Sequence, residues 1–235
     1  MGSDPLALLV SCEHGGNQVP PEYAHLFASP EAQSLLKSHR ALDIGALPVA
    51  IDLAQRLSAP LLSWVVTRLL VEANRSLEAP DLFSSLTRDL PQTDRDAIIK
   101  RYYLPYRTSM ERTTAALIGS GHRVLHLSVH SCTDELNGNR REFELGLLFD
   151  PQRSFEVRVV QHITGWFARA HPEYRVVHNQ PYLGTDDGLT TELRKQFPDL
   201  VYAGIELELR QGHIREMKTA MALSEAIAES VQSFR

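Results

Sequence analysis

Histidine and carboxylate side chains follow apolar segments of the chain at the points where strands would end. His14 lies in the segment 13–16 (EHGG), directly after an apolar run, and His130 follows another such run, just before Ser131. Glu206 and Glu208 lie in a third apolar segment. In an open α/β sheet, functional groups gather beyond the carboxyl ends of the strands. Two histidines with carboxylates nearby are the ligand types of an open catalytic zinc site, so metal-assisted chemistry is the first hypothesis.

Arginine side chains accompany these groups. Arg68 and the pair Asn74-Arg75 follow a further apolar run. A guanidinium group suits the bidentate capture of a substrate carboxylate, which makes Arg75 a candidate for substrate binding. The alternative is that Arg75 is a surface arginine in a loop. Arg68 and Arg140 could likewise only balance a neighbouring carboxylate.

Other common catalytic motifs are missing from the sequence. It contains no HExxH helix, no CxxC pair, no Walker A loop, no GxGxxG and no GxSxG elbow. Phosphate-cradling, dinucleotide-binding and serine-hydrolase functions therefore lose their main support.

The composition is typical of a globular protein without a basic surface. The 235 residues are 43% hydrophobic, which is enough for one domain with a sizeable core. The net charge of −5 and the lack of a basic stripe make nucleic acid an unlikely partner. Two cysteines, Cys12 and Cys132, do not make a disulfide framework, and the apolar run 6–12 is too short for a signal peptide or a membrane span. We therefore expect a cytoplasmic protein that does not bind a membrane.

Apolar runs alternate with helical periodicity along the whole chain. We expect strands at residues 6–12, 60–66, 124–129, 144–150, 174–178 and 201–209. We expect helices at 43–57 with Asp43 as N-cap, at 94–118 with a kink at Pro105, at 155–170, and from 214 onward. The segments 67–92 and 179–188 are expected to be loops, and the first is a candidate pocket wall.

This alternation predicts an α/β fold in a single domain, residues 1–235, with a mixed, mostly parallel sheet flanked by helices. Glu206 and Glu208 are two residues apart and therefore point to the same face of their strand. On an internal strand, two such carboxylates are hard to explain as solvated side chains. The alternative is an edge strand with a solvated face.

A series of short motifs runs through the chain from Leu8 to Arg210. They are EHGGN at 13–17 followed by Val19-Pro20, Asp43-Ile44-Gly45-Ala46, Asn74-Arg75, His130-Ser131, Arg140 ahead of Leu145-Gly146, Asn179-Gln180-Pro181-Tyr182, and Glu206 to Arg210. In this order and spacing they resemble the N-formylglutamate amidohydrolase family. Each motif alone is short, and their common order makes the resemblance specific.

The resemblance implies a fold similar to that of zinc carboxypeptidases (the phosphorylase/hydrolase-like fold) and aspartoacylase-like deacylases. Hallmarks of those enzymes are an Asn-Arg pair that grips a substrate carboxylate, a metal-ligating His-Ser and a catalytic Glu in Glu-Leu-Arg. By this likeness Asn74 and Arg75 bind the substrate carboxylate and His130 binds the metal. Glu208 is the catalytic glutamate.

One departure from the carboxypeptidase pattern concerns the third metal ligand. Carboxypeptidases bind zinc through a His and a Glu three residues later, but the residue three after His14 is Asn17, a poor zinc ligand. We expect Asp43 to replace that carboxylate, which gives His14, Asp43 and His130 as the zinc ligands. Alternatively, Asp43 only caps its helix or orients His14 from outside the metal shell.

The function implied by the resemblance is zinc-dependent hydrolysis of the amide bond of an N-acyl amino acid. The best-matching substrate is N-formyl-L-glutamate, which gives formate and L-glutamate, an end step of histidine degradation in that family. Glu208 would serve as general base and Arg68 would stabilise the oxyanion, while Arg140 and Tyr182 would be further substrate contacts. One alternative is a related metallo-deacylase or carboxypeptidase-like enzyme with another acyl-amino acid or peptide substrate. The other is a non-catalytic amino-acid-binding protein that keeps the arginine clamp.

Overall fold

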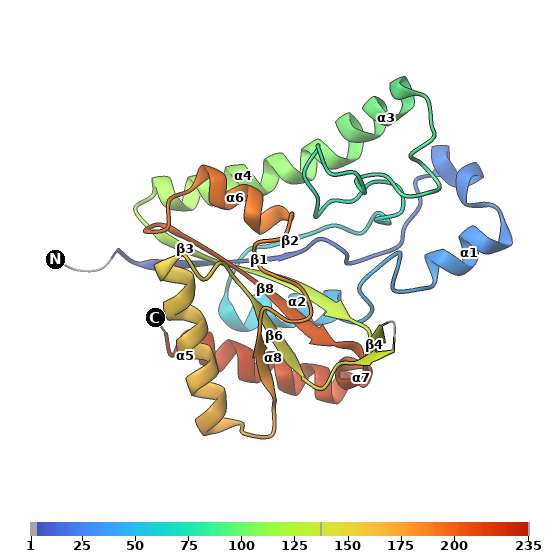
Figure 1. Cartoon of the computed structure of the whole chain (residues 1–235). Helices are drawn as coiled ribbons and strands as arrows, with labels where there is room; N and C mark the ends of the chain where they lie inside the picture. Colours follow the sequence, from blue (N-terminus) through green and yellow to red (C-terminus); the bar gives the residue numbers. More distant parts are fainter. Residues whose placement is uncertain (1–3, 137, 235) are drawn as a thin grey trace.

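Six strands form one mixed sheet in the order β2-β1-β3-β8-β6-β7 (Figure 1). The computed structural model describes residues 4–136 and 138–234, and its strands in this sheet are β1 (Leu6–Cys12), β2 (Leu61–Ser63), β3 (Arg123–Cys132), β6 (Leu145–Leu148), β7 (Val176–His178) and β8 (Tyr202–Arg210). β1, β2, β3 and β8 are parallel, β6 runs antiparallel to β8, and β7 is parallel to β6. The predicted α/β fold with a mixed, mostly parallel sheet is confirmed.

Helices cover both faces of this sheet (Figure 1). α2, α5 and α8 pack on one face, and α4 and α6 lie over the other. The helix bounds are α1 (Pro30–Leu36), α2 (Ala46–Leu57), α3 (Gln92–Ile98), α4 (Leu104–Gly119), α5 (Ser154–Ala170), α6 (Leu189–Gln196), α7 (Gln211–Ile214) and α8 (Met217–Gln232), with a 3₁₀ helix at Pro21–Phe27 and a hairpin of β4 (Glu135–Leu136) and β5 (Asn139–Arg140). All helices of the described residues lack the length or the apolar character needed to cross a lipid bilayer.

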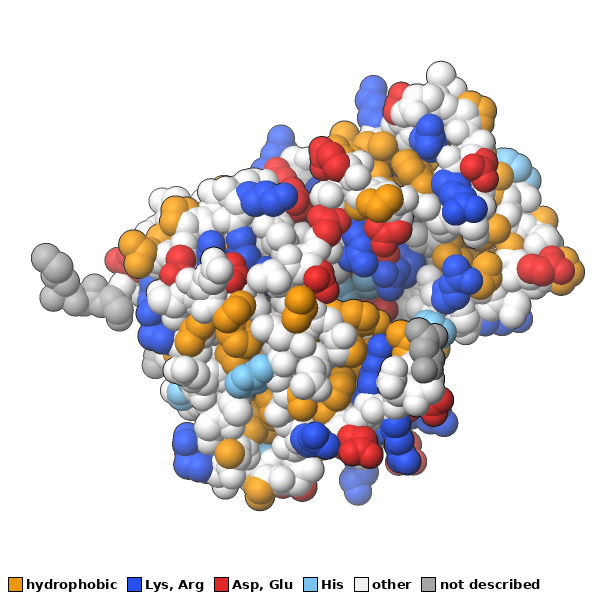
Figure 2. Space-filling view, in the orientation of Figure 1, with side chains coloured by type: hydrophobic (Ala, Val, Ile, Leu, Met, Phe, Trp, Pro, Cys, Tyr) orange, Lys and Arg blue, Asp and Glu red, His pale blue; other side chains and the backbone are white. Residues whose placement is uncertain are grey.

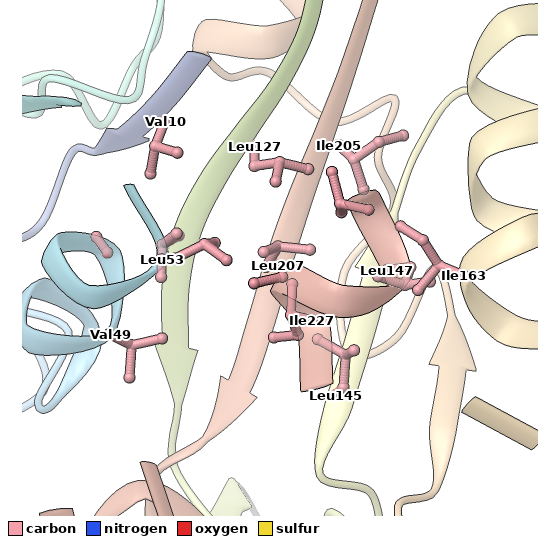
Figure 3. Packing of buried hydrophobic residues seen from close by; sticks show 14 of the residues in the cluster. Val10, Val49, Leu53, Leu127, Leu145, Leu147, Ile163, Ile205, Leu207 and Ile227 are labelled. Carbon is pink, nitrogen blue, oxygen red and sulfur yellow. The ribbon is translucent and has the colours of Figure 1, made fainter. Parts of the chain in front are cut away.

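Alternate residues of the central strands point to opposite faces, which separates an apolar side of the sheet from a polar one. Leu127 of β3 and Leu207 of β8 belong to the core formed with α2, α5 and α8 (Figure 3). Ser128 and His130 of β3 point to the opposite face, where both contact the Glu13 carboxylate. The polar residues of the two central strands therefore converge on one side of the sheet.

The helix predicted to begin at Asp43 begins three residues later. α2 starts at Ala46, its N-cap is Gly45, and Gly45 has a φ of +85° that favours glycine. The prediction of Asp43 as N-cap is therefore wrong. The backbone carbonyl of Asp43 accepts a hydrogen bond from Ala46 N, while its carboxylate turns towards two histidines.

The single kinked helix predicted for 94–118 is three consecutive helical segments. α3 is followed by a π-helical segment, η2 (Ile99–Tyr103), and then by α4. Pro105 has no N–H to donate to the preceding turn, which disfavours regular α-helical bonding. Leu104 N bonds instead to Ile99 O, five residues back, so the π-helical turn accommodates the proline.

The central strands extend further than the apolar runs predict. β3 continues from the predicted end at 129 to Cys132, because His130 pairs with Glu208 and Cys132 pairs with Arg210 in the β3–β8 ladder. His130 therefore lies within a strand and not in the loop after it. A ladder between two strands is a long-range interaction that hydropathy alone does not reveal.

Three helices were not predicted, α1, α6 and the short α7, and the closing helix predicted from 214 begins at Met217. The start of α1 has a readable signal, because Ser29 caps it by accepting a hydrogen bond from Ala32 N and Pro30 occupies its first turn. The predicted loops at 67–92 and 179–188 are confirmed up to residue 91 and residue 188, respectively, because α3 begins at Gln92 and α6 at Leu189.

Gly16 marks a close approach between the loop after β1 and the segment after β2. A Cβ atom at Gly16 would lie 2.5 Å from Val65 O and 2.9 Å from Val65 Cα. We expect Gly16→Ala to lower the free energy of unfolding by about 1–3 kcal/mol, the usual cost of overpacking against backbone. Chemical denaturation measures this change. Gly119→Ala is the control, because a Cβ there meets nothing within 4 Å, and an equal loss in both variants would contradict the prediction.

Candidate metal centre and active site

The carboxyl ends of β1, β3 and β8 border a cavity of about 240 Å³. The cavity is lined by eight of the residues singled out from the sequence: His14, Asp43, Arg68, Asn74, Arg75, His130, Tyr182 and Glu208. Figure 2 shows a hollow on this face of the molecule, with basic and histidine side chains visible in and around it. The predicted gathering of functional groups at the strand ends is therefore observed.

His14, Asp43 and His130 form a compact buried cluster beside this cavity. Oδ2 of Asp43 lies 3.2 Å from Nδ1 of His14 and 3.0 Å from Nδ1 of His130. The two Nδ1 atoms are 3.2 Å apart. Three potential ligand atoms, from the end of β1, the segment before α2 and β3, thus form a nearly equilateral triangle.

Each histidine of the cluster also contacts a buried carboxylate through its other ring nitrogen. Nε2 of His14 lies 2.5 Å from Glu72 Oε1, and Nε2 of His130 lies 3.1 Å from Glu13 Oε2. Carboxylates bonded to metal-ligating histidines in this way orient the ring and raise its basicity. Sequence reasoning assigned no role to either residue, although Glu13 is the first residue of the EHGGN motif and Glu72 lies two residues before Asn74.

The donor set fits a divalent metal ion. Nε2–H groups that donate to carboxylates leave the two Nδ1 lone pairs facing the Asp43 oxygen, and a cation bound between these three acceptors would offset their mutual repulsion. Atoms bound to zinc at its usual distances in a tetrahedron are about 3.3 Å apart, close to the edges of the triangle. His14, Asp43 and His130 could therefore hold such an ion.

Glu208 lies next to the cluster with an unpartnered carboxylate oxygen. The side chain is buried, and its Oε2 has no hydrogen-bond partner among the residues that the structure describes. Burial raises the pKa of the Glu208 carboxyl to about 7. A carboxylate in this state is suited to exchange a proton with a bound molecule.

Glu206 shares the cavity with Glu208 but has a different environment. Its Oε1 accepts a hydrogen bond of 2.6 Å from Thr190 Oγ1.

β8 pairs with β3 on one side and β6 on the other, so the edge-strand alternative for these two glutamates is wrong.

Arg68 contacts two carboxylates, that of Asp43 in the cluster and that of Glu72 beside it. Its Nε donates to Glu72 Oε2 at 2.5 Å, and one terminal nitrogen lies 3.5 Å from Asp43 Oδ1. The side chain remains 24% exposed and lines the cavity. Arg68 is thus held in place by Glu72 and Asp43 while its guanidinium stays accessible.

Asn74 and Arg75 are held against the loop that precedes α6. Oδ1 of the buried Asn74 accepts a hydrogen bond from Leu189 N, and Arg75 donates to the carbonyl of Asp187 at 2.9 Å and to the Asp81 carboxylate at 3.1 Å. Arg75 is therefore an anchored residue of the cavity wall, unlike the surface arginine considered as its alternative.

The structure places Arg140 and its neighbour differently from the sequence expectation. Arg140 is exposed in β5 and is not among the residues that line the cavity, whereas Arg141 lines it. Arg141 donates to Thr133 and lies over the ring of Tyr182, 5.6 Å from its centroid. A repeated Arg-Arg in the sequence gives no signal that would separate the two.

Asn17, Cys12 and Cys132 lie near the motifs, and the contacts or burial of each indicate a structural role. The Nδ2 of Asn17 donates to the carbonyl of Leu36, which ties the loop after β1 to α1. Cys12 and Cys132 are buried free thiols. Burial raises the pKa of Cys12 well above its usual value and that of Cys132 to about 12, so neither is a thiolate nucleophile.

Comparison with solved structures identifies similar chains. The gene product Atu2144 from Agrobacterium tumefaciens is 27% identical, with a TM-score of 0.81 over 97% of this chain and 91% of that one. An N-formylglutamate amidohydrolase from Ralstonia eutropha JMP134 is 20% identical, with a TM-score of 0.66 over 99% of this chain and 96% of that one, and this likeness concerns the fold. A search of curated proteins gives no match.

The sequence itself also matches a family model. The model describes N-formylglutamate amidohydrolases and matches residues 6–215, which include the cluster, Arg75 and Glu208. The chain therefore belongs to the N-formylglutamate amidohydrolase family.

Proposed function

We propose that the protein is a metal-dependent amidohydrolase that cleaves an N-acyl amino acid, with N-formyl-L-glutamate as the substrate and formate and L-glutamate as the products. The observation that carries the proposal is the triangle of His14, Asp43 and His130 beside the unpartnered oxygen of Glu208. Family membership supports the reaction class. The donor set of two imidazoles and one carboxylate is one that zinc prefers.

The three residues of the triangle would hold the metal ion. A zinc ion bound there would lower the pKa of a water molecule towards about 7 and would polarise a carbonyl group. Glu72, which contacts Nε2 of His14, would keep that imidazole ring oriented for metal binding.

Glu208 would move the proton that the reaction requires. Its free Oε2 accepts a proton from the attacking water, and the protonated carboxyl then donates it to the leaving nitrogen of the amino acid. The carboxylate is regenerated, so the reaction consumes only one water molecule. Arg68, which lies beside Asp43 at the cavity wall, would stabilise the negative charge on the acyl oxygen.

The remaining polar residues of the cavity would bind the amino acid. Asn74 and Arg75, which both line the cavity, would hold its α-carboxylate, as the Asn-Arg pair does in the resembling enzymes. Tyr182 lines the same cavity, with Arg141 in the place expected for Arg140. Arg141 makes no ion pair within the described parts of the chain, which leaves its charge free for a second carboxylate of the substrate.

The partner is then a small molecule, and we place the reaction in the cytoplasm because Cys12 and Cys132 are both unpaired.

Formate release from N-formyl-L-glutamate tests the proposed function. The purified protein is expected to contain about one zinc ion per chain, to release formate, and to lose activity on treatment with a chelator and regain it with zinc. A panel of N-acetyl and N-succinyl amino acids and short peptides, assayed in parallel, identifies a different acyl-amino acid or peptide substrate. Tight amino-acid binding without metal or turnover would contradict the proposal and indicate a binding protein.

A further inference from the structure

Glu13 is a fully buried carboxylate beneath the candidate metal centre. It accepts hydrogen bonds from Tyr106 of α4 at 2.6 Å and from Ser128 of β3 at 2.5 Å. Its Oε2 also lies 3.1 Å from Nε2 of His130. The end of β1, β3 and α4 are thus joined through one side chain, which also contacts a candidate metal ligand.

The bonds around Glu13 determine which nitrogen of His130 carries the proton. An ionised carboxylate only accepts hydrogen bonds, so Nε2 must be the donor in this contact. The Ser128 hydroxyl donates its single proton to Glu13 and lies 2.9 Å from Nε2, where its oxygen can only accept. Both neighbours therefore favour a proton on Nε2 of His130, which leaves Nδ1, the atom that faces Asp43, as the nitrogen that can offer a lone pair to a metal ion.

The charge balance at Glu13 also differs from that of other buried carboxylates. Glu156 is equally buried, but it is paired with the guanidinium groups of Arg153 and Arg194. Within the described residues, His130 is the one ion-pair partner of Glu13. A buried carboxylate without a permanent cation is costly, and positive charge held at Nδ1 of His130 would offset that cost through the imidazole ring.

We infer that Glu13 is a positioning residue of the metal centre, one that fixes the tautomer and orientation of His130 with the help of Tyr106 and Ser128. The inference rests on the proposed function, because it requires that His130 binds a metal ion. Glu13, at the end of β1, would thus orient His130, which belongs to β3.

Glu13→Gln tests this role, because glutamine keeps the shape but can present an amide N–H to the ring. We expect the zinc affinity, measured by competition with a chromophoric chelator, to fall by about 10–100-fold, the usual effect of removing such a carboxylate. The visible absorption spectrum of the cobalt-substituted protein should change, because the orientation of one ligand changes. Glu156→Gln is the matched control, since it removes an equally buried carboxylate away from the cavity, and its zinc affinity and cobalt spectrum should equal those of the wild type.

Two results would overturn the inference. One is a folded Glu13→Gln protein whose zinc affinity and cobalt spectrum match the wild type, and the other is an equal loss of affinity in Glu156→Gln. If the wild type itself binds neither zinc nor cobalt, the proposed function fails, and the inference fails with it. A wild type that binds zinc while Glu13→Gln binds it equally well overturns the inference alone.

A second pair of variants is available if Glu13→Gln does not fold. Tyr106→Phe and Ser128→Ala each remove one hydrogen bond to Glu13 and leave the carboxylate in place. Each is expected to weaken zinc binding, and the effect of the two substitutions together should differ from the sum of their separate effects, because both act through Glu13. Unchanged zinc affinity in the protein that carries both Tyr106→Phe and Ser128→Ala would overturn the inference.

Discussion

Glu208→Gln is expected to lower kcat for N-formyl-L-glutamate by about 10²–10⁴-fold, the usual contribution of a general acid–base group. The physical reason is that the amide of glutamine cannot take up the proton for which the free Oε2 of Glu208 is placed. The zinc content should stay the same, because Glu208 lies outside the triangle of ligand atoms. Steady-state formate release, with metal analysis of the same samples, measures both quantities.

Glu206→Gln is the matched control for that experiment. It removes a carboxylate from the same face of the same strand, two residues away, but one whose Oε1 is already bonded to Thr190. We expect a smaller loss of kcat, below the range expected for a general acid–base group. Substantial turnover in Glu208→Gln, or a larger loss in Glu206→Gln, would exclude Glu208 as the proton-transferring group.

Asp43→Asn is expected to remove the metal ion together with the activity. Oδ2 of Asp43 contacts the Nδ1 atoms of both His14 and His130, and it also accepts a hydrogen bond from Ser131 N. Asparagine keeps the size but loses the negative charge that offsets the charge of the ion. The fall in zinc affinity should exceed the roughly 10–100-fold that is typical of a residue bonded only to a ligand.

Asp52→Asn provides the comparison, because Asp52 is paired with Arg56 on the surface of α2 and has no contact with the cavity. The zinc affinity of the Asp52→Asn protein should match that of the wild type. If Asp43→Asn retains one zinc ion per chain with an affinity within the range of an outer carboxylate, Asp43 orients His14 and does not bind the metal.

Much of the fold was predictable from local pattern. The run 6–12 predicts β1 at its observed bounds, and the helical spacing of 155–170 predicts α5 to within one residue. At Asp43 the prediction failed because of an interaction with distant segments. Asp43 was assigned to a helix start because local rules favour aspartate there, whereas the structure uses its carboxylate at His14 and His130.

The candidate site shows the same limit. Family motifs singled out His14, His130 and Glu208, and the structure brings them together. Glu13 and Glu72 were missed because their role depends on which nitrogen of each histidine they contact, and that is decided by packing across the sheet. Arg141 could not be separated from Arg140, since only the path of the hairpin decides which of the two reaches the cavity.

The pairing of β1 with β3 has a consequence for unfolding. The ligand atoms of the triangle come from positions 29, 87 and 116 residues apart, so an unfolded chain holds no part of the site together. An ion bound only by the folded chain, at about 1,000 times its Kd, adds about 4 kcal/mol to the free energy of unfolding. The ion and the central strands should then be lost in a single cooperative transition. The melting temperature of this enzyme would therefore report the concentration of free metal around it.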